Sequence, residues 1–268
     1  MLPQPATVSI RYPVSPSSVD AWVIPEGTVP ESIIHEQAAE ALRLVLEFWA
    51  ARRRPGARIA RSFAIRFYEE DWRKGIDPDV CVLDPAPDNL EELGSLCLWK
   101  PGHVPPTICF EVVSLSHPNK DYTTIQDRYA VMRCKELVIF DPTLAGPKST
   151  GGPVLLQLWR RDEAGTLSRV HFGNYSVYSE VLEAWLIPNA KRLVISEDEQ
   201  GTWPWPTEAE HAQLQARQYQ VQTERAQADA ERAQADAERA QADAERLRRS
   251  NEALQRELAE LKARLGKP

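Results

Sequence analysis

A seven-residue repeat near the C-terminus constrains this chain more than any other feature. The sequence Ala-Gln-Ala-Asp-Ala-Glu-Arg occurs three times in register, at 226–232, 233–239 and 240–246, with neither proline nor glycine inside it. A heptad repeat of this kind is typical of a coiled-coil helix. We therefore predict a coiled-coil helix over residues 208–268, in which residues 208–266 would extend roughly 90 Å.

The predicted seam of this helix changes character along its length. Alanines take both seam positions in the repeats, and the last turns carry leucines together with one asparagine: Leu247, Leu254 and Leu261 at position d, and Asn251, Leu258 and Leu265 at position a. Alanine buries little area, so the leucine-rich end would supply most of any association. Asn251 at an a position favours a parallel pair, and we expect a homodimer through residues 208–268. A single charged helix that never pairs stays open as the alternative.

The remainder of the chain is long enough for one packed domain. Apolar residues make up 43% of the sequence, and no run reaches the ~18 residues of a membrane span. The N-terminus lacks the pattern of a secretory signal, and the four cysteines lack Cys-x-x-Cys spacing. These features predict a cytoplasmic protein with no membrane partner, whose cysteines are small buried hydrophobic residues. We expect a globular domain over 1–200 and a stiff Pro/Trp linker over 201–207.

Apolar periodicity predicts helices packed on a central mixed sheet. Residues 1–32 are rich in proline and serine and indicate an irregular lead-in. Helices are expected over 33–53, 121–134 and 177–187, and strands over 62–68, 80–83, 108–113 and 136–142, followed by a hairpin of 154–161 and 167–172. The expected fold class is α/β (α+β), a mixed sheet flanked by helices, with the C-terminal coiled-coil helix appended.

Two acidic residues lie inside apolar, β-branched stretches of this domain. Asp79 precedes Val80-Cys81-Val82, and Glu111 lies within Ile108-Cys109-Phe110-Glu111-Val112-Val113. An unpaired charge buried there would cost several kcal/mol, so each carboxylate needs a partner. Mg²⁺ suits two converging carboxylates, because it binds oxygen ligands and keeps open positions for water and phosphate. This chemistry points to cleavage of phosphodiester bonds.

The charge of the chain gives less support to nucleic-acid binding. The formal net charge is −7, whereas proteins that contact phosphates usually present a basic face. The only concentrated basic run consists of Arg52, Arg53, Arg54, Arg58, Arg61 and Arg66. This run either contacts phosphates or is a solvated helix end. His35 on the first helix is a further candidate for phosphate contact, and a hydrogen-bonded helix-start histidine is the equal alternative.

An ordered set of short segments resembles a known family. Pro78-Asp79-Val80, Glu111-Val112-Val113-Ser114, Asp121 with Tyr129-Ala130, and Glu136 to Pro142 are together similar to the Uma-type putative restriction endonucleases. These are bacterial proteins of the PD-(D/E)xK nuclease superfamily, and the likeness runs from about Trp22 to Trp185. It implies a restriction-endonuclease-like fold that uses Mg²⁺, with Mn²⁺ also possible. The implied metal ligands are Asp79, Glu111 and the backbone carbonyl of Val112.

The chain departs from the family pattern at the lysine. The superfamily usually places a lysine two residues after the glutamate, where this chain has Val113, and the Uma-type family moves it to the position of Ile125. Lys120 and Gln126 lie nearby and are the candidate catalytic replacements. A surface loop lysine is the simpler explanation of Lys120.

Two functions from different classes follow. The first is a metal-dependent endonuclease that hydrolyses DNA phosphodiester bonds, with two catalytic domains paired by the coiled coil. The second is a catalytically impaired nuclease-fold protein that acts as a binding or assembly module through its coiled coil. The Asp79/Glu111 pair favours the first, and the missing lysine favours the second.

Overall fold

The computed structural model describes residues 9–11, 32–189 and 191–265. The chain divides into two compact units, Met1–Ala209 and Glu210–Pro268. The first is a mixed α+β domain, which confirms the predicted fold class, and the second is helical throughout its described part. Most of the predicted irregular lead-in, including Trp22, lies outside the described residues. Residues 201–207, predicted to be a linker, lie within the first unit.

The helices follow the local sequence closely. They are α1 (Ile33–Arg53), α2 (Lys120–Thr123), α3 (Ile125–Met132) and α4 (Glu208–Leu265), with 3₁₀ turns η2 (Leu90–Glu92) and η3 (Lys148–Thr150). Ser32 caps α1, because its hydroxyl accepts a hydrogen bond from the His35 N–H at 3.3 Å. The single helix predicted over 121–134 is two helices, which meet at Thr124. No described helix combines the length and hydrophobicity that crossing a membrane requires.

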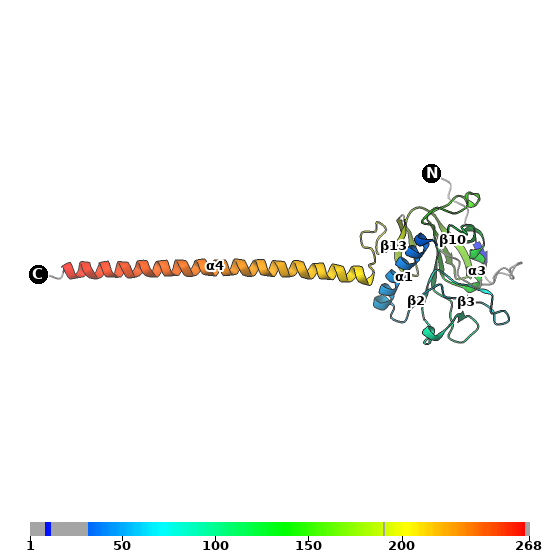
Figure 1. Ribbon diagram of the computed structural model, residues 1–268, viewed down its shortest axis with the longest axis horizontal. Helices are drawn as coiled ribbons and strands as arrows, with labels where there is room; N and C mark the ends of the chain where they lie inside the picture. Colours follow the sequence, from blue (N-terminus) through cyan, green and yellow to red (C-terminus); the bar gives the residue numbers. More distant parts are fainter. Residues whose placement is uncertain (1–8, 12–31, 190, 266–268) are drawn as a thin grey trace. The chain divides into compact units, whose positions relative to one another are not determined.

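One mixed sheet forms the centre of the domain (Figure 1). In the described part of the chain its seven strands run in the order β1-β10-β9-β8-β7-β5-β2, and only the β7–β8 pair is parallel. The strands are β1 (Ser9–Arg11), β2 (Arg58–Arg61), β5 (Val80–Leu83), β7 (Ile108–Val112), β8 (Glu136–Phe140), β9 (Leu156–Arg161) and β10 (Thr166–Gly173). Buried apolar runs on β5, β7 and β8 place these strands at the centre, as predicted.

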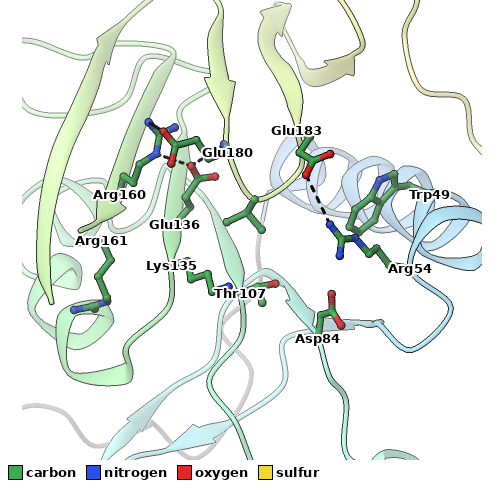
Figure 2. A pocket seen from close by; sticks show the side chains of 11 residues that line it. Trp49, Arg54, Asp84, Thr107, Lys135, Glu136, Arg160, Arg161, Glu180 and Glu183 are labelled. Atoms are coloured by element: carbon green, nitrogen blue, oxygen red, sulfur yellow. Dashed lines mark hydrogen bonds and ion pairs between the residues drawn. The ribbon is translucent and has the colours of Figure 1, made fainter. Parts of the chain in front are cut away.

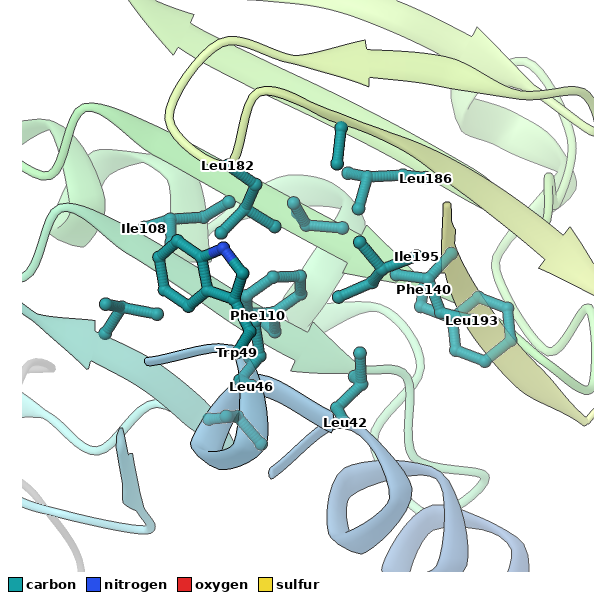
Figure 3. Packing of buried hydrophobic residues seen from close by; sticks show 14 of the residues in the cluster. Leu42, Leu46, Trp49, Ile108, Phe110, Phe140, Leu182, Leu186, Leu193 and Ile195 are labelled. Atoms are coloured by element: carbon teal, nitrogen blue, oxygen red, sulfur yellow. The ribbon is translucent and has the colours of Figure 1, made fainter. Parts of the chain in front are cut away.

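Each face of the sheet is covered by a helix layer and a small three-stranded sheet. On one face, Leu42 and Leu46 of α1 pack with Phe110, Phe140 and other core residues (Figure 3). The same core includes the sheet β11 (Val177–Ser179), β12 (Ala184–Asn189) and β13 (Arg192–Ser196). The other face is covered by α2, α3 and the sheet of β3 (Ile65–Arg66), β4 (Gly75–Ile76) and β6 (Leu96–Cys97).

The segment 177–187 corrects the sequence prediction. It was expected to be a short helix, but it contains β11 and the start of β12, which pair antiparallel. The turn between them places Glu183 at φ 54°, without the glycine, proline or asparagine that usually announces a turn. The buried alternation of Leu182, Ala184 and Leu186 was the available strand signal. The strand expected over 62–68 is also shorter, because only Ile65–Arg66 forms β3.

The cysteines lie where the sequence predicted. All four are free thiols in the interior: Cys81, Cys97, Cys109 and Cys134. Cys81 and Cys109 face each other across the β5–β7 ladder, in the core beneath α3. Burial raises the pKa of the Cys109 thiol well above its ordinary value, so this thiol stays protonated.

Candidate active site

The sheet brings Asp79 and Glu111 together at one end. Strand β5 runs antiparallel to β7 with Val80 opposite Phe110, so Asp79, which immediately precedes β5, lies beside the C-terminal end of β7. The N–H of Val112 donates a hydrogen bond to Asp79 Oδ2 at 2.6 Å. The two carboxylates that were singled out in the sequence therefore belong to one site, which is placed by the central strands.

Helix α1 closes this site on the side of Asp79. His35, in the first turn of α1, is buried, and its Nε2 lies 3.0 Å from the same Oδ2 of Asp79. Oδ2 thus has two partners, and no hydrogen bond within the described residues engages Oδ1 of Asp79. His35, predicted as a phosphate contact, is in the site but beneath the surface, where it orients Asp79.

Glu111 is deeply buried, at 1% exposure. Its side chain points to the face that α3 covers, and the hydroxyl of Tyr129 donates a hydrogen bond to Oε1. Burial raises the pKa of Glu111 well above its ordinary value, and the positive charge of Lys120 acts in the opposite direction. A cation near Glu111 therefore favours the ionised carboxylate.

Lys120 supplies a positive charge at this position. Its Nζ lies 3.7 Å from Glu111 Oε2 and 3.6 Å from Asp121 Oδ1, and its side chain is about half exposed. The carboxylate of Glu111, helped by those of Asp121, Asp79 and Asp77, raises the pKa of Lys120. Asp121 is itself buried, and this burial raises its pKa to about 7. Lys120 thus lies between the buried acids and the surface.

Gln126 and Ile125 contribute to the packing and hydrogen bonding of the fold. The Nε2 of Gln126 donates a hydrogen bond to the Asp121 carbonyl at 2.8 Å, which ties the start of α3 to α2. Ile125 and Val113, at the two positions where related nucleases carry lysine, are buried in the apolar core. Of the two residues predicted to replace the lysine, the structure therefore places the charged group of Lys120 beside Glu111 and gives Gln126 a role in the α2–α3 turn.

The backbone carbonyl of Val112 in β7 lies on the same side of the strand as Asp79. In an extended strand, the N–H and C=O of one residue point to the same side. The N–H of Val112 points to Asp79, whereas that of Val113 donates to Phe140 of β8 at 2.8 Å. The Val112 carbonyl therefore lies on the Asp79 side of β7. Its oxygen and the carboxylates of Asp79 and Glu111 are hard donors, which fit Mg²⁺ or Mn²⁺.

This donor set is sparse. Among the described residues, no three His, Cys, Asp or Glu side chains are close enough to hold a metal ion. Two carboxylates and one carbonyl suffice for an Mg²⁺ site only if water and phosphate oxygens complete the coordination. Such a site would bind the cation weakly in the absence of substrate.

The arginine run is divided between the two ends of the domain: Arg52 to Arg58 lie at the end opposite the site, whereas Arg61 lies across from Val80, beside Asp79. Arg52 follows His35 by about 17 residues, which separates them by about 25 Å along α1. Three members are paired with acids: Arg53 with Glu197 at 2.7 Å, Arg54 with Glu183 at 4.0 Å, and Arg61 with Glu36 and Glu40 of α1. Arg58 donates hydrogen bonds to the carbonyls of Pro55 and Ala57, and Arg52 stacks on Phe48. Of the expected basic patch, Arg52, Arg53, Arg54 and Arg58 therefore do not adjoin Asp79 and Glu111, and Arg61, which lies beside Asp79, is paired with acids of α1.

A cavity of about 280 Å³ marks this opposite end (Figure 2). Asp84 follows β5, Thr107 precedes β7 and Glu136 opens β8, so these lining residues occupy the strand ends farthest from Asp79 and Glu111. Arg160 pairs with Glu136 and Glu180, both at 2.8 Å. The lining charges thus largely neutralise one another.

Sequence reasoning missed three contributions to the site. His35 was expected either to contact phosphate or to be a hydrogen-bonded helix-start histidine, without Asp79 as its partner, and Tyr129 and Asp121 were noted only as parts of a family pattern. All three are buried polar residues on helices, and their roles depend on contacts between distant segments. The available signal was the position of Asp121 and Tyr129 on either side of Ile125, close to the place of the missing lysine.

Residues 22–149 match the model of the Uma2 family, described as putative restriction endonuclease. This match indicates a nuclease-like domain. A solved structure that resembles it is a putative nuclease belonging to DUF820 from Anabaena variabilis ATCC 29413, with 13% identity, a TM-score of 0.38, and coverage of 58% of this chain and 76% of that one. No curated protein matches the chain.

Proposed function

We propose that the protein is a metal-dependent endonuclease that hydrolyses phosphodiester bonds of DNA. The observation that carries the proposal is the convergence of Asp79 and Glu111 at the end of β5 and β7, with the Val112 carbonyl on the same side. These three groups would hold Mg²⁺, or Mn²⁺ in its place. The family match to restriction endonucleases supports DNA as the substrate.

Each residue of the site has a distinct task in this proposal. A divalent cation bound there would supply a water of lowered pKa and positive charge beside the scissile phosphate. His35 fixes the orientation of Asp79, and Tyr129 fixes that of Glu111. Lys120 is long, charged and half exposed, so its ammonium can reach phosphate oxygens from the position it occupies beside Glu111. It would perform the task of the lysine absent at Val113 and Ile125.

Cleavage of supercoiled plasmid tests this function. Wild type, Glu111→Gln, Lys120→Ala and Lys120→Arg are compared with Mg²⁺, with Mn²⁺ and with EDTA. We expect metal-dependent nicking that falls about 100-fold or more in Glu111→Gln and Lys120→Ala, with part of the activity kept in Lys120→Arg. Nicking that persists in EDTA or in Glu111→Gln would contradict the proposal.

A second candidate function rests on Val113 and Ile125. Both are apolar and buried where related nucleases carry lysine, which favours a binding or assembly module without turnover. This candidate predicts no cleavage by any of the four proteins. A melting temperature that does not respond to Mn²⁺ would add support to it.

The proposed functional unit is a homodimer joined through α4. Two copies would present two catalytic sites, which makes cleavage of both DNA strands easier. The exposed leucines of the last turns of α4 support this pairing: Leu247, Leu254, Leu258 and Leu261 are each more than half exposed in the single chain.

A further inference from the structure

The exposed face of α4 has two parts with different chemistry. Over the three repeats, the side chains at both seam positions are alanines, which offer little apolar area to a partner. From Leu247 onward, the same seam carries leucines that are 55–67% exposed. One continuous helix, Glu208–Leu265, joins the two parts. Before the repeats, Tyr219 at a d position is also exposed, at 70%, but it is a single ring. Most of the apolar area that the seam can bury therefore lies beyond Arg246.

Charges beside the leucine seam complement a second copy in parallel register. In a parallel pair, a residue at position g faces the e residue that lies five places further along the partner. Asp243 then faces Arg248 of the second copy, and Glu257 faces Lys262. The two-fold symmetry of the pair doubles both contacts. Asn251 at position a meets its own counterpart, where two amides can form a hydrogen bond.

The antiparallel arrangement lacks these advantages. When the leucine segments are aligned about their centre, Arg248 of one copy faces Lys262 of the other, and Glu257 faces its own counterpart. Each is a contact between like charges, and such contacts disfavour the arrangement. Asn251 would then lie against Leu261 and would bury its amide without a polar partner.

We propose that α4 pairs two copies of this chain in parallel through the leucine seam of Leu247–Leu265, with Asp243 as the adjoining contact, and that the alanine repeats form a spacer which contributes little to association. This inference rests on the proposed homodimer and specifies its partner, orientation and extent. The spacer from Ala226 to Arg246 extends about 32 Å. Some of its charges are paired within the same helix: Asp229 and Asp236 each lie 3.9 Å from the arginine three residues on.

Two deletions in the full chain test where pairing occurs. Removal of residues 226–246 takes out three whole heptads and keeps the seam in phase, whereas removal of 247–268 takes out the leucine segment. Light scattering should give a dimer for the full chain and for the first deletion, and a monomer for the second. A dimer that survives without 247–268, or is lost without 226–246, would overturn the inference and leave the homodimer proposal standing. A monomeric full chain would overturn both.

Single cysteines test orientation. Asn251→Cys and Gln255→Cys are matched variants on the same helix, and the four native thiols are buried. With oxidised glutathione as the oxidant, a parallel pair brings the two copies of position 251 together, and Asn251→Cys gives a disulfide-linked dimer. In the centred antiparallel pair the two copies of position 255 meet instead. Cross-linking of Gln255→Cys in preference to Asn251→Cys would overturn the parallel orientation.

Discussion

His35 and Asp79 are 44 residues apart in the chain, and their side chains meet with 3.0 Å between Nε2 and Oδ2. The contact joins the first turn of α1 to the start of β5. It occupies the carboxylate oxygen that also accepts the Val112 N–H, and it leaves Oδ1 as the oxygen available to a cation. A buried imidazole in this position acts on Asp79, the proposed metal ligand, rather than on substrate.

Replacement of His35 should therefore weaken metal binding without removing it. Partners that orient metal ligands typically contribute 10–100-fold in affinity, so we expect His35→Ala to bind Mn²⁺ about 10-fold more weakly in calorimetric titration. His117→Ala is the matched control, because His117 is exposed on the loop between β7 and α2. Equal affinities of the two variants would contradict the positioning role.

Loss of the Tyr129 hydroxyl should destabilise the domain through Glu111. Tyr129→Phe keeps the ring but removes the hydrogen bond to a carboxylate that is 1% exposed. We expect a loss of about 1–3 kcal/mol in the free energy of unfolding, measured with urea. Tyr175→Phe changes a hydroxyl on a ring that is 63% exposed and should cost less than about 0.5 kcal/mol. If both variants lost a similar free energy of unfolding, the hydrogen bond between Tyr129 and Glu111 would not be important for stability.

The segment before α4 should contribute strongly to the stability of the globular unit. Trp205 stacks on Trp49 with ring centroids 5.5 Å apart, and its indole N–H donates to Glu197 at 2.7 Å. Trp205→Ala should cost about 3–5 kcal/mol. The nearby Trp203 is 69% exposed, so Trp203→Ala should cost less than about 0.5 kcal/mol. If denaturant unfolding gave the same midpoint for both variants, residues 201–207 would be a linker in the energetic sense.

His171 should make stability depend on pH. Burial lowers its pKa from 6.5 to about 4, and its ring packs edge-on against Tyr175. In the unfolded chain the imidazole gains a proton below pH 6.5, whereas in the folded chain it stays neutral to about pH 4. Its contribution is therefore complete above pH 6.5 and is lost as the pH falls toward 4. We expect wild type to lose about 2 kcal/mol more than His171→Phe between pH 7.5 and pH 5. If the midpoint of urea unfolding shifted equally in wild type and in His171→Phe between pH 7.5 and pH 5, the prediction would be refuted.

The local pattern of apolar residues was sufficient to predict the regular helices and strands. Helix α1 and strands β5 and β7 were predicted nearly to their ends, because apolar spacing, the proline and glycine after α1, and unbroken β-branched runs all act within a few residues. The segment 177–187 failed because its turn at Glu183 carries no typical turn residue. Tertiary packing of Leu182 and Leu186 into the α1 core decided its structure.

The two carboxylates of the site could be predicted from the sequence, but the residues that contact them could not. Asp79 and Glu111 stood out because a charge in an apolar strand requires a partner. The contact of His35 with Asp79 depends on how α1 crosses the sheet, and no local pattern contains that information. The start of the arginine run illustrates the same limit: the length of α1 carries Arg52 and Arg53 to the far end of the domain, whereas Arg61 returns along β2 to the side of Asp79.

The buried cysteines make the protein a reporter of its own unfolding. A thiol reagent in solution reaches Cys81, Cys109 and Cys134 only when the sheet separates from α3, since each of these side chains is fully buried. The rate of labelling under native conditions thus measures how often the nuclease-like domain opens. Ligands that close the domain, a divalent cation among them, would slow that labelling even where no cleavage can be detected.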